Sequence, residues 1–142
     1  MKTLKKDNII VARLDDGEDV FQSLEAVFEK FKLTFGVVIS GVGMLRQVKL
    51  GYFLGQGKYK KSRYKSCFEI TSFTGNLSLN ESKEFKAHIH TVLAKKNKKT
   101  VGGHLVSAVV HNTLELVILE VKTKSVFRRF NPSTKLEGLE IE

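Results

Sequence analysis

Four histidines, all between residues 88 and 111, are the most chemically active side chains of this 142-residue sequence. His88 and His90 lie two residues apart in an apolar segment typical of a β-strand, where side chains at i and i+2 point to the same face. A hairpin centred on Asn97 would pair residues whose numbers sum to 194, and it would place His104 directly opposite His90. Cross-strand partners have Cβ atoms about 4.5 to 5.5 Å apart. We therefore predict that His88, His90 and His104 share one face.

Three neutral imidazoles without a thiolate suit zinc, and also nickel, cobalt or iron, and they leave a fourth tetrahedral position for water or a ligand. Open sites of this type are usually catalytic. The alternative is a set of surface or hydrogen-bonded strand histidines, because a lone histidine is seldom a metal ligand. A hairpin register shifted by one residue would also move His104 to the other face. His111 follows His104 by seven residues and is expected on the opposite face of a regular strand, so it is left out of the predicted site.

Other polar residues near this region have two interpretations each. Glu69 lies among apolar residues of a predicted strand, so it could orient a metal-bound histidine, act as a general base, or form an ordinary salt bridge. Cys67 is the only cysteine, which excludes an internal disulfide and a cysteine-based zinc finger, fits a reducing compartment, and predicts a small core residue. Gly102 and Gly103 allow another backbone or a ligand to approach closely, and a plain β-bulge explains them equally well.

The net charge of +9 comes from 24 Lys and Arg against 15 Asp and Glu, and it is unevenly placed. Residues 44–66 carry +7 and residues 83–104 carry +5. Such clusters attract nucleic acid or other polyanions, although a solvated lysine-rich surface gives the same composition. The segment between the two histidine strands is the predicted phosphate contact, with aromatic residues interleaved in residues 44–66 but no recognisable base-stacking motif. Its lysines are Lys95, Lys96, Lys98 and Lys99.

The elements that must position these residues are mostly strands. Apolar residues at helical spacing from Val20 to Phe31, preceded by an acidic cap, predict a helix over residues 17–32. Gly41 and Gly43 predict a tight connection between two strands rather than a phosphate-binding loop, because no helix pattern follows them. We predict strands at 8–14, 35–40, 47–54, 68–73, around residue 77, and at 85–93, 101–110 and 114–121.

This pattern predicts a single α+β domain covering residues 1–142, with its core at about 7–130 and a surface extension at 131–142. The expected architecture is a largely antiparallel or mixed sheet with one long helix packed on it. No signal-peptide pattern is present, and no apolar run approaches the ~18 residues that a membrane span needs. We expect a cytoplasmic protein.

Five short motifs occur in order along the chain, and they cover nearly all of it: Gly17-Glu18-Asp19-Val20, Val38-Ile39-Ser40-Gly41-Val42-Gly43, Phe68-Glu69-Ile70-Thr71-Ser72-Phe73-Thr74-Gly75-Asn76, His88-Ile89-His90 and Gly102-Gly103-His104-Leu105. Together they resemble the PPC (plants and prokaryotes conserved) domain, which occurs alone in bacteria and archaea and fused to AT-hooks in plants. The resemblance implies an α/β fold with a mixed sheet and a homotrimer. It also implies that His88, His90 and His104 are the positions where some prokaryotic members hold a metal, zinc.

Three functions remain open at this point. The leading hypothesis is a non-enzymatic homotrimer with a three-histidine metal site and a basic surface that contacts DNA or a regulatory protein. The family is often described as DNA-binding, but in plants the AT-hook contacts the minor groove, and this sequence has no Arg-Gly-Arg-Pro hook. The rivals are a metal-dependent enzyme with Glu69 as base, and a sensor whose small ligand occupies the open metal position.

Overall fold

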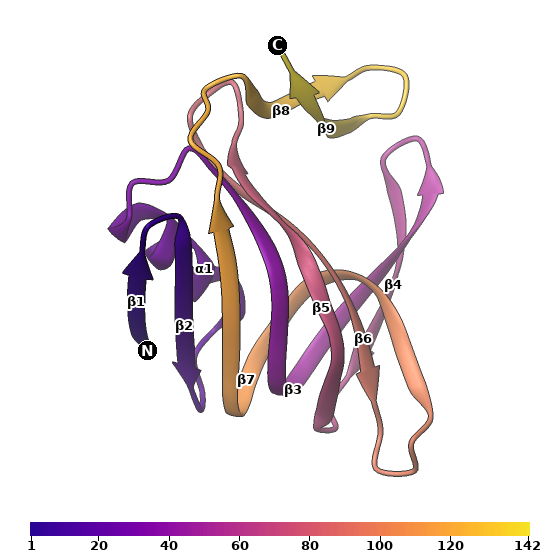
Figure 1. Cartoon of the computed structure of the whole chain (residues 1–142). Helices are drawn as coiled ribbons and strands as arrows, with labels where there is room; N and C mark the ends of the chain where they lie inside the picture. The colour runs from indigo at the N-terminus through magenta and orange to yellow at the C-terminus, as the bar shows by residue number, and fades with distance from the viewer.

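Antiparallel β-structure dominates the computed structural model, which describes residues 1–142 (Figure 1). Seven strands form one sheet in the order β1-β2-β7-β6-β5-β3-β4, and β8 pairs with β9 in a separate two-stranded sheet. In chain order the elements are β1 (Lys2–Lys6), β2 (Ile9–Asp15), α1 (Val20–Lys30), β3 (Phe35–Gly55), β4 (Lys58–Tyr64), β5 (Phe68–Leu79), β6 (Phe85–Ala94), β7 (Thr100–Glu120), β8 (Val126–Asn131) and β9 (Leu136–Ile141).

The largely antiparallel sheet with a single helix confirms the predicted architecture, whereas the mixed sheet does not occur. Every strand pair is antiparallel, and the one parallel feature is an isolated bridge between Asn80 and Arg128. Because β7 also pairs with β3, the strands β3, β5, β6 and β7 close into a ring in which each strand has two paired neighbours. Within this ring no strand edge is free, whereas β1 and β4 outside it each have one paired neighbour.

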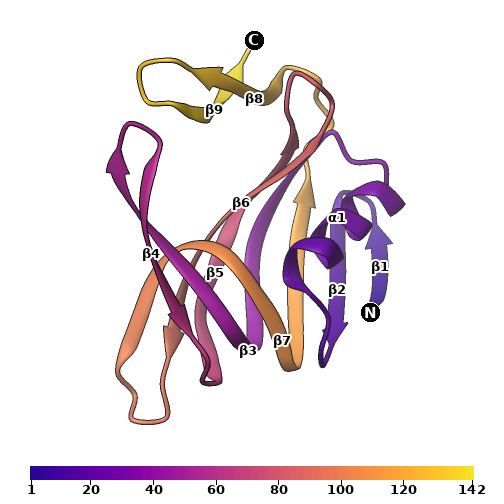
Figure 2. The same cartoon turned by 180° about the vertical axis from the view of Figure 1, so that it is seen from behind.

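The helix is shorter than predicted, with eleven residues from Val20 to Lys30 instead of sixteen. Asp19 is its N-cap and accepts hydrogen bonds from the backbone N–H groups of Phe21 and Gln22. Gly17 has a φ of +87° and Lys32 a φ of +51°, so the backbone leaves the helical region on both sides. The buried stripe of α1 packs over β2, β6 and β7 (Figure 2). No helix has the length and apolar character to cross a bilayer.

The predicted connection at residues 40–43 is wrong, because β3 runs unbroken through it, as β7 runs through residues 111–113. The two 21-residue strands pair with each other along their length, and four register shifts let them bend around the core. Gly43 lies at one shift with a φ of +141°, and a Cβ there would meet the carbonyl oxygen of Thr113. The glycine therefore permits a bend and a close strand approach, not a chain reversal.

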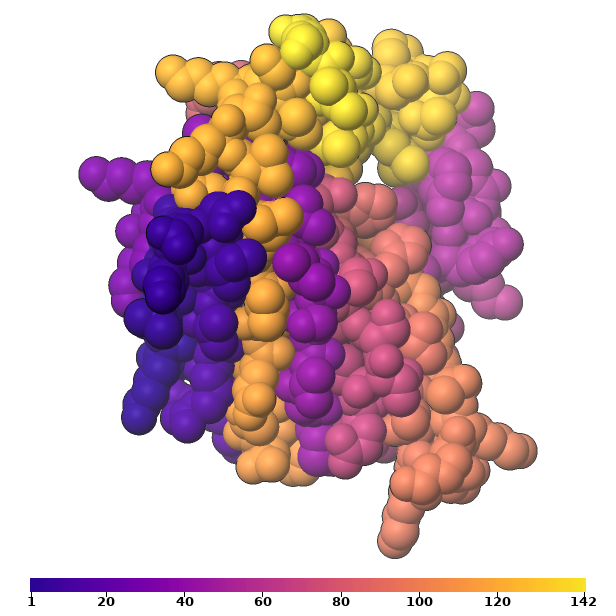
Figure 3. Space-filling model, in the orientation of Figure 1, coloured from indigo at the N-terminus to yellow at the C-terminus, as the bar shows by residue number.

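The C-terminal strands β8 and β9, with the hairpin tip between them, cross one end of the sheet (Figures 1 and 3). The 131–142 segment expected as an extension thus includes β9, paired with β8. Asn80 joins this hairpin to β5, since its side-chain amide donates to Glu84 and Glu137. Arg128 of β8 is buried beneath the hairpin. Sequence pattern did not predict β1, β4, β8 or β9.

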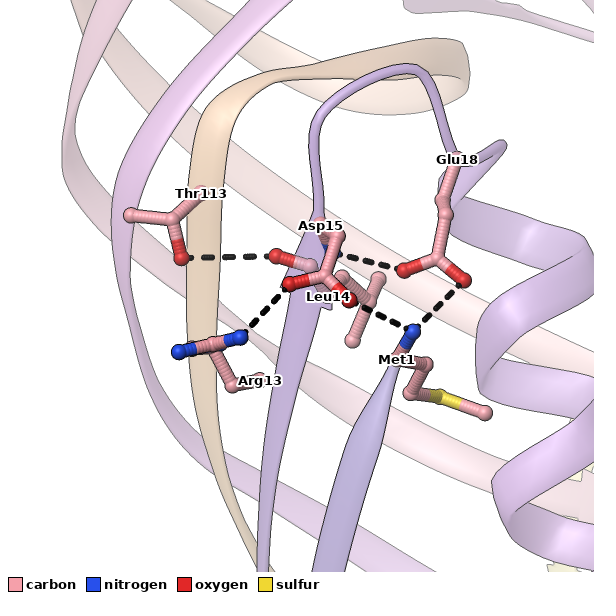
Figure 4. A network of polar contacts seen from close by, with 6 residues as sticks. All are labelled: Met1, Arg13, Leu14, Asp15, Glu18 and Thr113. Atoms are coloured by element: carbon pink, nitrogen blue, oxygen red, sulfur yellow. Dashed lines mark hydrogen bonds and ion pairs between the residues drawn. The ribbon is translucent and has the colours of Figure 1, made fainter.

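At the other end, the loop that leads into α1 is fixed by a polar network (Figure 4). The amino group of Met1 lies 2.8 Å from Asp15 Oδ2 and 3.1 Å from Glu18 Oε1. Arg13 donates to Asp15, and the backbone N–H of Asp15 donates to Glu18. These contacts hold the N-terminal strand against the start of the helix.

Candidate metal centre

The three histidines of the predicted site meet on the outer side of the β6–β7 hairpin. His90 pairs directly with His104, as the register centred on Asn97 predicted. Ile89 between the two β6 histidines is fully buried, so His88 and His90 point away from the core. Gly103 has a φ of +150°, and a Cβ there would lie 2.9 Å from the carbonyl oxygen of Gly51. Gly103 therefore allows β3 to lie close against β7 next to His104.

The ring nitrogens converge as metal ligands do. The Nε2 atoms of His88 and His90 are 3.3 Å apart, and one candidate ligand atom from each of the three histidines lies within 4.8 Å of the others. Two nitrogens bound at about 2.0 to 2.1 Å to one tetrahedral ion lie ~3.3 Å apart. The separation of His88 and His90 matches that edge, and the candidate ligand atom of His104 lies within 4.8 Å of both.

The surroundings keep two of these rings uncharged. Burial is the main reason that the pKa of His88 is lowered to about 4, followed by the positive charge of Arg128 and by the other two histidines. Burial also lowers the pKa of His104, with His90 and Arg128 acting in the same direction. Both rings are neutral at pH 7, which is the state that can bind a metal. The Nδ1 atom of His104 is buried without a hydrogen-bond partner. Two neutral rings, one of them with an unpaired buried nitrogen, fit a divalent transition metal.

A small hollow of about 170 Å³ opens beside the cluster. His88 and His104 form one side, and the C-terminal hairpin forms the other through Arg128 and Glu137. Tyr59 of β4 lies against His104, with ring centroids 5.4 Å apart. Sequence reasoning missed Tyr59 and Arg128 because both come from strands that the pattern did not predict. The segment Val126-Phe127-Arg128-Arg129-Phe130 does not alternate between apolar and polar residues, so it gives no clear strand signal.

The family comparison agrees with this architecture. The family model of the Plants and Prokaryotes Conserved domain, abbreviated PCC or PPC, matches residues 1–122. The chain belongs to the PPC family. The match includes all three clustered histidines and ends before β8.

Known PPC structures share the fold over the whole chain. A PPC protein from Pyrococcus horikoshii is 26% identical and has a TM-score of 0.82. The match covers 99% of this chain and 96% of that protein. A protein from Archaeoglobus fulgidus, described as metal-containing, is 31% identical with a TM-score of 0.83 and full coverage of both chains. A bifunctional protein GlmU from a Synechococcus strain is 29% identical over 131 residues. This chain spans only 20% of the length of that relative, although 92% of the chain is matched.

Three other residues considered from the sequence lie outside the cluster. Glu69 was expected in the strand core, but its side chain is exposed. It pairs with Ala94, four residues from His90 along β6, which corresponds to about 13 Å. Cys67 was expected in the core and is also exposed, because it lies just outside β5. His111 contacts Arg46 at 3.2 Å and lies 3.7 Å from Asp16, within a separate polar group of the PPC fold.

The basic segments of this PPC domain are likewise separate from the histidines. Lys96, Lys98 and Lys99 are exposed at the tip of the β6–β7 hairpin, and Lys95 is partly buried with its ammonium 5.7 Å from the ring centre of Tyr64. This contact brings the hairpin tip next to β4, whose lysines and arginine are exposed. None of these basic residues forms an ion pair. The lysines of the hairpin tip and the basic residues of β4 therefore form a basic surface that is free of ion pairs and is joined at the Lys95–Tyr64 contact.

Proposed function

We propose that this PPC-family protein binds a divalent transition metal, zinc in the first place, through His88, His90 and His104, and acts as a non-enzymatic homotrimer. The convergence of three ring nitrogens within 4.8 Å carries the proposal. The description of the Archaeoglobus fulgidus relative as metal-containing supports it. When bound, such a metal would polarise a ligand at its fourth position.

The arrangement favours binding over hydrolysis. No carboxylate hydrogen-bonds to any of the three histidines, and Glu69 is too far along the strand to act as their base. Glu137 is the carboxylate that lines the hollow, but its oxygens face Asn80 Nδ2 at 3.2 Å and Lys86 Nζ at 3.4 Å. A general base must reach the proton that it removes. A role in sensing or structural stabilisation therefore fits the site better than metal-assisted catalysis.

Elemental analysis of protein purified without a histidine tag tests the metal site. Wild-type protein should contain close to one metal ion per chain, and His90→Ala and His104→Ala should each lose it. His111→Ala is the matched control, because His111 lies on the same strand outside the cluster, and it should keep the metal. A folded wild-type protein that stays metal-free after incubation with zinc, nickel or cobalt would refute this part of the proposal.

Exposed apolar side chains on the solvent-facing side of β1, β2 and β3 support the homotrimer. Leu4 is 67% exposed and pairs with Val11, which is 47% exposed and pairs in turn with Val117 of β7. Ile39 and Val42 of β3 are 48% and 63% exposed on the adjoining strand. Contiguous apolar patches on a protein surface mark association sites. A second and a third copy of the chain would cover this face.

Sedimentation equilibrium measures the assembly. Wild-type protein should have three times the 16.0 kDa mass of the chain, and Val42→Glu should shift it toward the monomer. Ile141→Glu changes an exposed apolar residue of the C-terminal hairpin and should leave the mass unchanged. A monomeric wild type at micromolar concentration would contradict the trimer.

A second candidate function is nucleic-acid binding by the unpaired basic surface. Each phosphate contact contributes a slope of about −0.9 to the dependence of log affinity on log salt for duplex DNA. Replacing Lys95, Lys96, Lys98 and Lys99 by Ala should therefore weaken binding to a fluorescent duplex and flatten that slope. The control is Lys122→Ala with Lys124→Ala, which removes two lysines outside this surface. Undetectable or salt-independent binding by the wild type would leave a regulatory protein as the expected partner.

A further inference from the structure

Arg128 is a buried cation without a counter-ion. Its side chain is 8% exposed, and its guanidinium donates to the backbone carbonyl of Glu137 at 3.0 Å and to Asn76 Oδ1 at 2.6 Å. Both acceptors are uncharged, and no carboxylate lies within ion-pair distance. The Nε–H group is buried and has no partner at all. A buried charge of this kind is costly unless an opposite charge reaches it.

The unpaired charge is placed beside the metal centre. Arg128 lines the same hollow as His88 and His104, and its NH2 group is bonded to Asn76, the cross-strand partner of His88. The three histidines bring no negative charge to a divalent metal. The only carboxylate in the hollow, Glu137, is directed to Asn80 and Lys86. No carboxylate therefore forms an ion pair with Arg128 or a hydrogen bond with the histidines, although the charge of Glu137 acts on the guanidinium from a distance.

We propose that the hollow binds a small carboxylate anion, with its oxygens shared between the open metal position and the guanidinium of Arg128. This inference rests on the proposed metal site. The planar fork of arginine matches the two oxygens of a carboxylate. Ala87, Leu136 and the ring of Tyr59 line the same space and provide an apolar wall for a short carbon skeleton. At about 170 Å³ the hollow is smaller than the ~300 to 1,000 Å³ of typical ligand pockets, so the ligand is small.

Cobalt-substituted protein allows a direct test, because the visible spectrum of the ion responds to a change of ligand. The metal content of each sample is measured first, so that failure to bind cobalt is recognised as failure of the metal site itself. Metal-loaded wild type is then titrated with acetate, with acetamide as an uncharged analogue of the same shape, and with inorganic phosphate as a competing oxyanion. Acetate should change the spectrum saturably and acetamide should not. A response to phosphate alone would overturn the choice of a carboxylate.

Arg128→Gln should keep cobalt but bind acetate roughly tenfold to a hundredfold more weakly, since it loses a charge-assisted hydrogen bond. Arg129→Gln is the matched control: Arg129 is the next residue, its guanidinium is paired with Glu81 and Glu142, and acetate binding should be unchanged. If Arg128→Gln does not fold, the wild-type titration still decides the matter. Cobalt-loaded wild type whose spectrum ignores acetate, or a folded Arg128→Gln that binds acetate as tightly as wild type, would overturn the proposal.

Discussion

Replacing His104 by phenylalanine should stabilise the metal-free protein and abolish metal binding at the same time. His104 Nδ1 is buried without a partner, and burial lowers the pKa of the ring. The imidazole therefore costs stability in the absence of metal. Phenylalanine has a similar planar ring, keeps the stacking contact with Tyr59, and has no polar atom to leave unpaired.

The magnitude follows from the cost of an unsatisfied buried polar atom, which is about 1–3 kcal/mol. The contact of the ring with Tyr59 is retained, and the phenyl ring is only slightly larger than imidazole. Allowing for a small packing cost, the free energy of unfolding of metal-free His104→Phe should rise by about 1 kcal/mol. In the presence of metal the wild type should be more stable than His104→Phe, because a metal at a hundred times its dissociation constant stabilises the wild type by about 2.7 kcal/mol.

Urea unfolding at pH 7.5, with a chelator and then with excess zinc, measures both differences. His111→Phe is the control, because His111 Nδ1 does have a partner in Arg46 and that substitution should destabilise the protein. If metal-free His104→Phe is less stable than the wild type by 1 kcal/mol or more, the buried nitrogen is not the cost that we infer. If the variant still gains stability from zinc, His104 is not a ligand.

Three further predictions concern the titration of His88, the cap of α1 and the backbone at Gly43. In the metal-free protein the His88 ring has a pKa of about 4 when folded and about 6.5 when unfolded. The free energy of unfolding should therefore fall by about 1–2 kcal/mol as the pH drops from 6.5 to about 4, for this half-buried ring. His88→Asn should flatten the plot of urea midpoint against pH. Asp19→Ala removes the cap of α1 and should lower the free energy of urea unfolding by about 1 kcal/mol, whereas Asp19→Asn should stay near the wild type. Gly43→Ala places a Cβ against the Thr113 carbonyl and should cost more than about 3 kcal/mol in the same assay, while Gly55→Ala, with a positive φ but open space, should cost about 1 kcal/mol.

The histidine cluster could be predicted from the sequence because its geometry is local. Strand alternation places His88 and His90 on one face, and a short hairpin around Asn97 fixes the position of His104. The errors concern features set by distant contacts. Gly43 looks like a chain reversal until β7 is known to lie beside it, and Glu69 looks buried until its neighbours show that Phe68 and Ile70 take the core side of the strand. Arg128 could not be foreseen, since nothing in its own segment indicates that β8 will lie against the end of β5.

The three histidines and Arg128 differ in whether the PPC family model includes them. All three candidate metal ligands fall within the matched residues 1–122, whereas Arg128 lies beyond them. The candidate metal ligands and Arg128 therefore lie in separate parts of the chain. A PPC protein that has the three histidines, but an uncharged residue where the crossing strand places Arg128, should bind cobalt with the same stoichiometry and respond to acetate only weakly. Introducing arginine at that position should raise its affinity for acetate and leave its affinity for acetamide unchanged, because only the anion gains an opposite charge in the buried site. Equal acetate affinity in both backgrounds would mean that the metal alone selects the ligand.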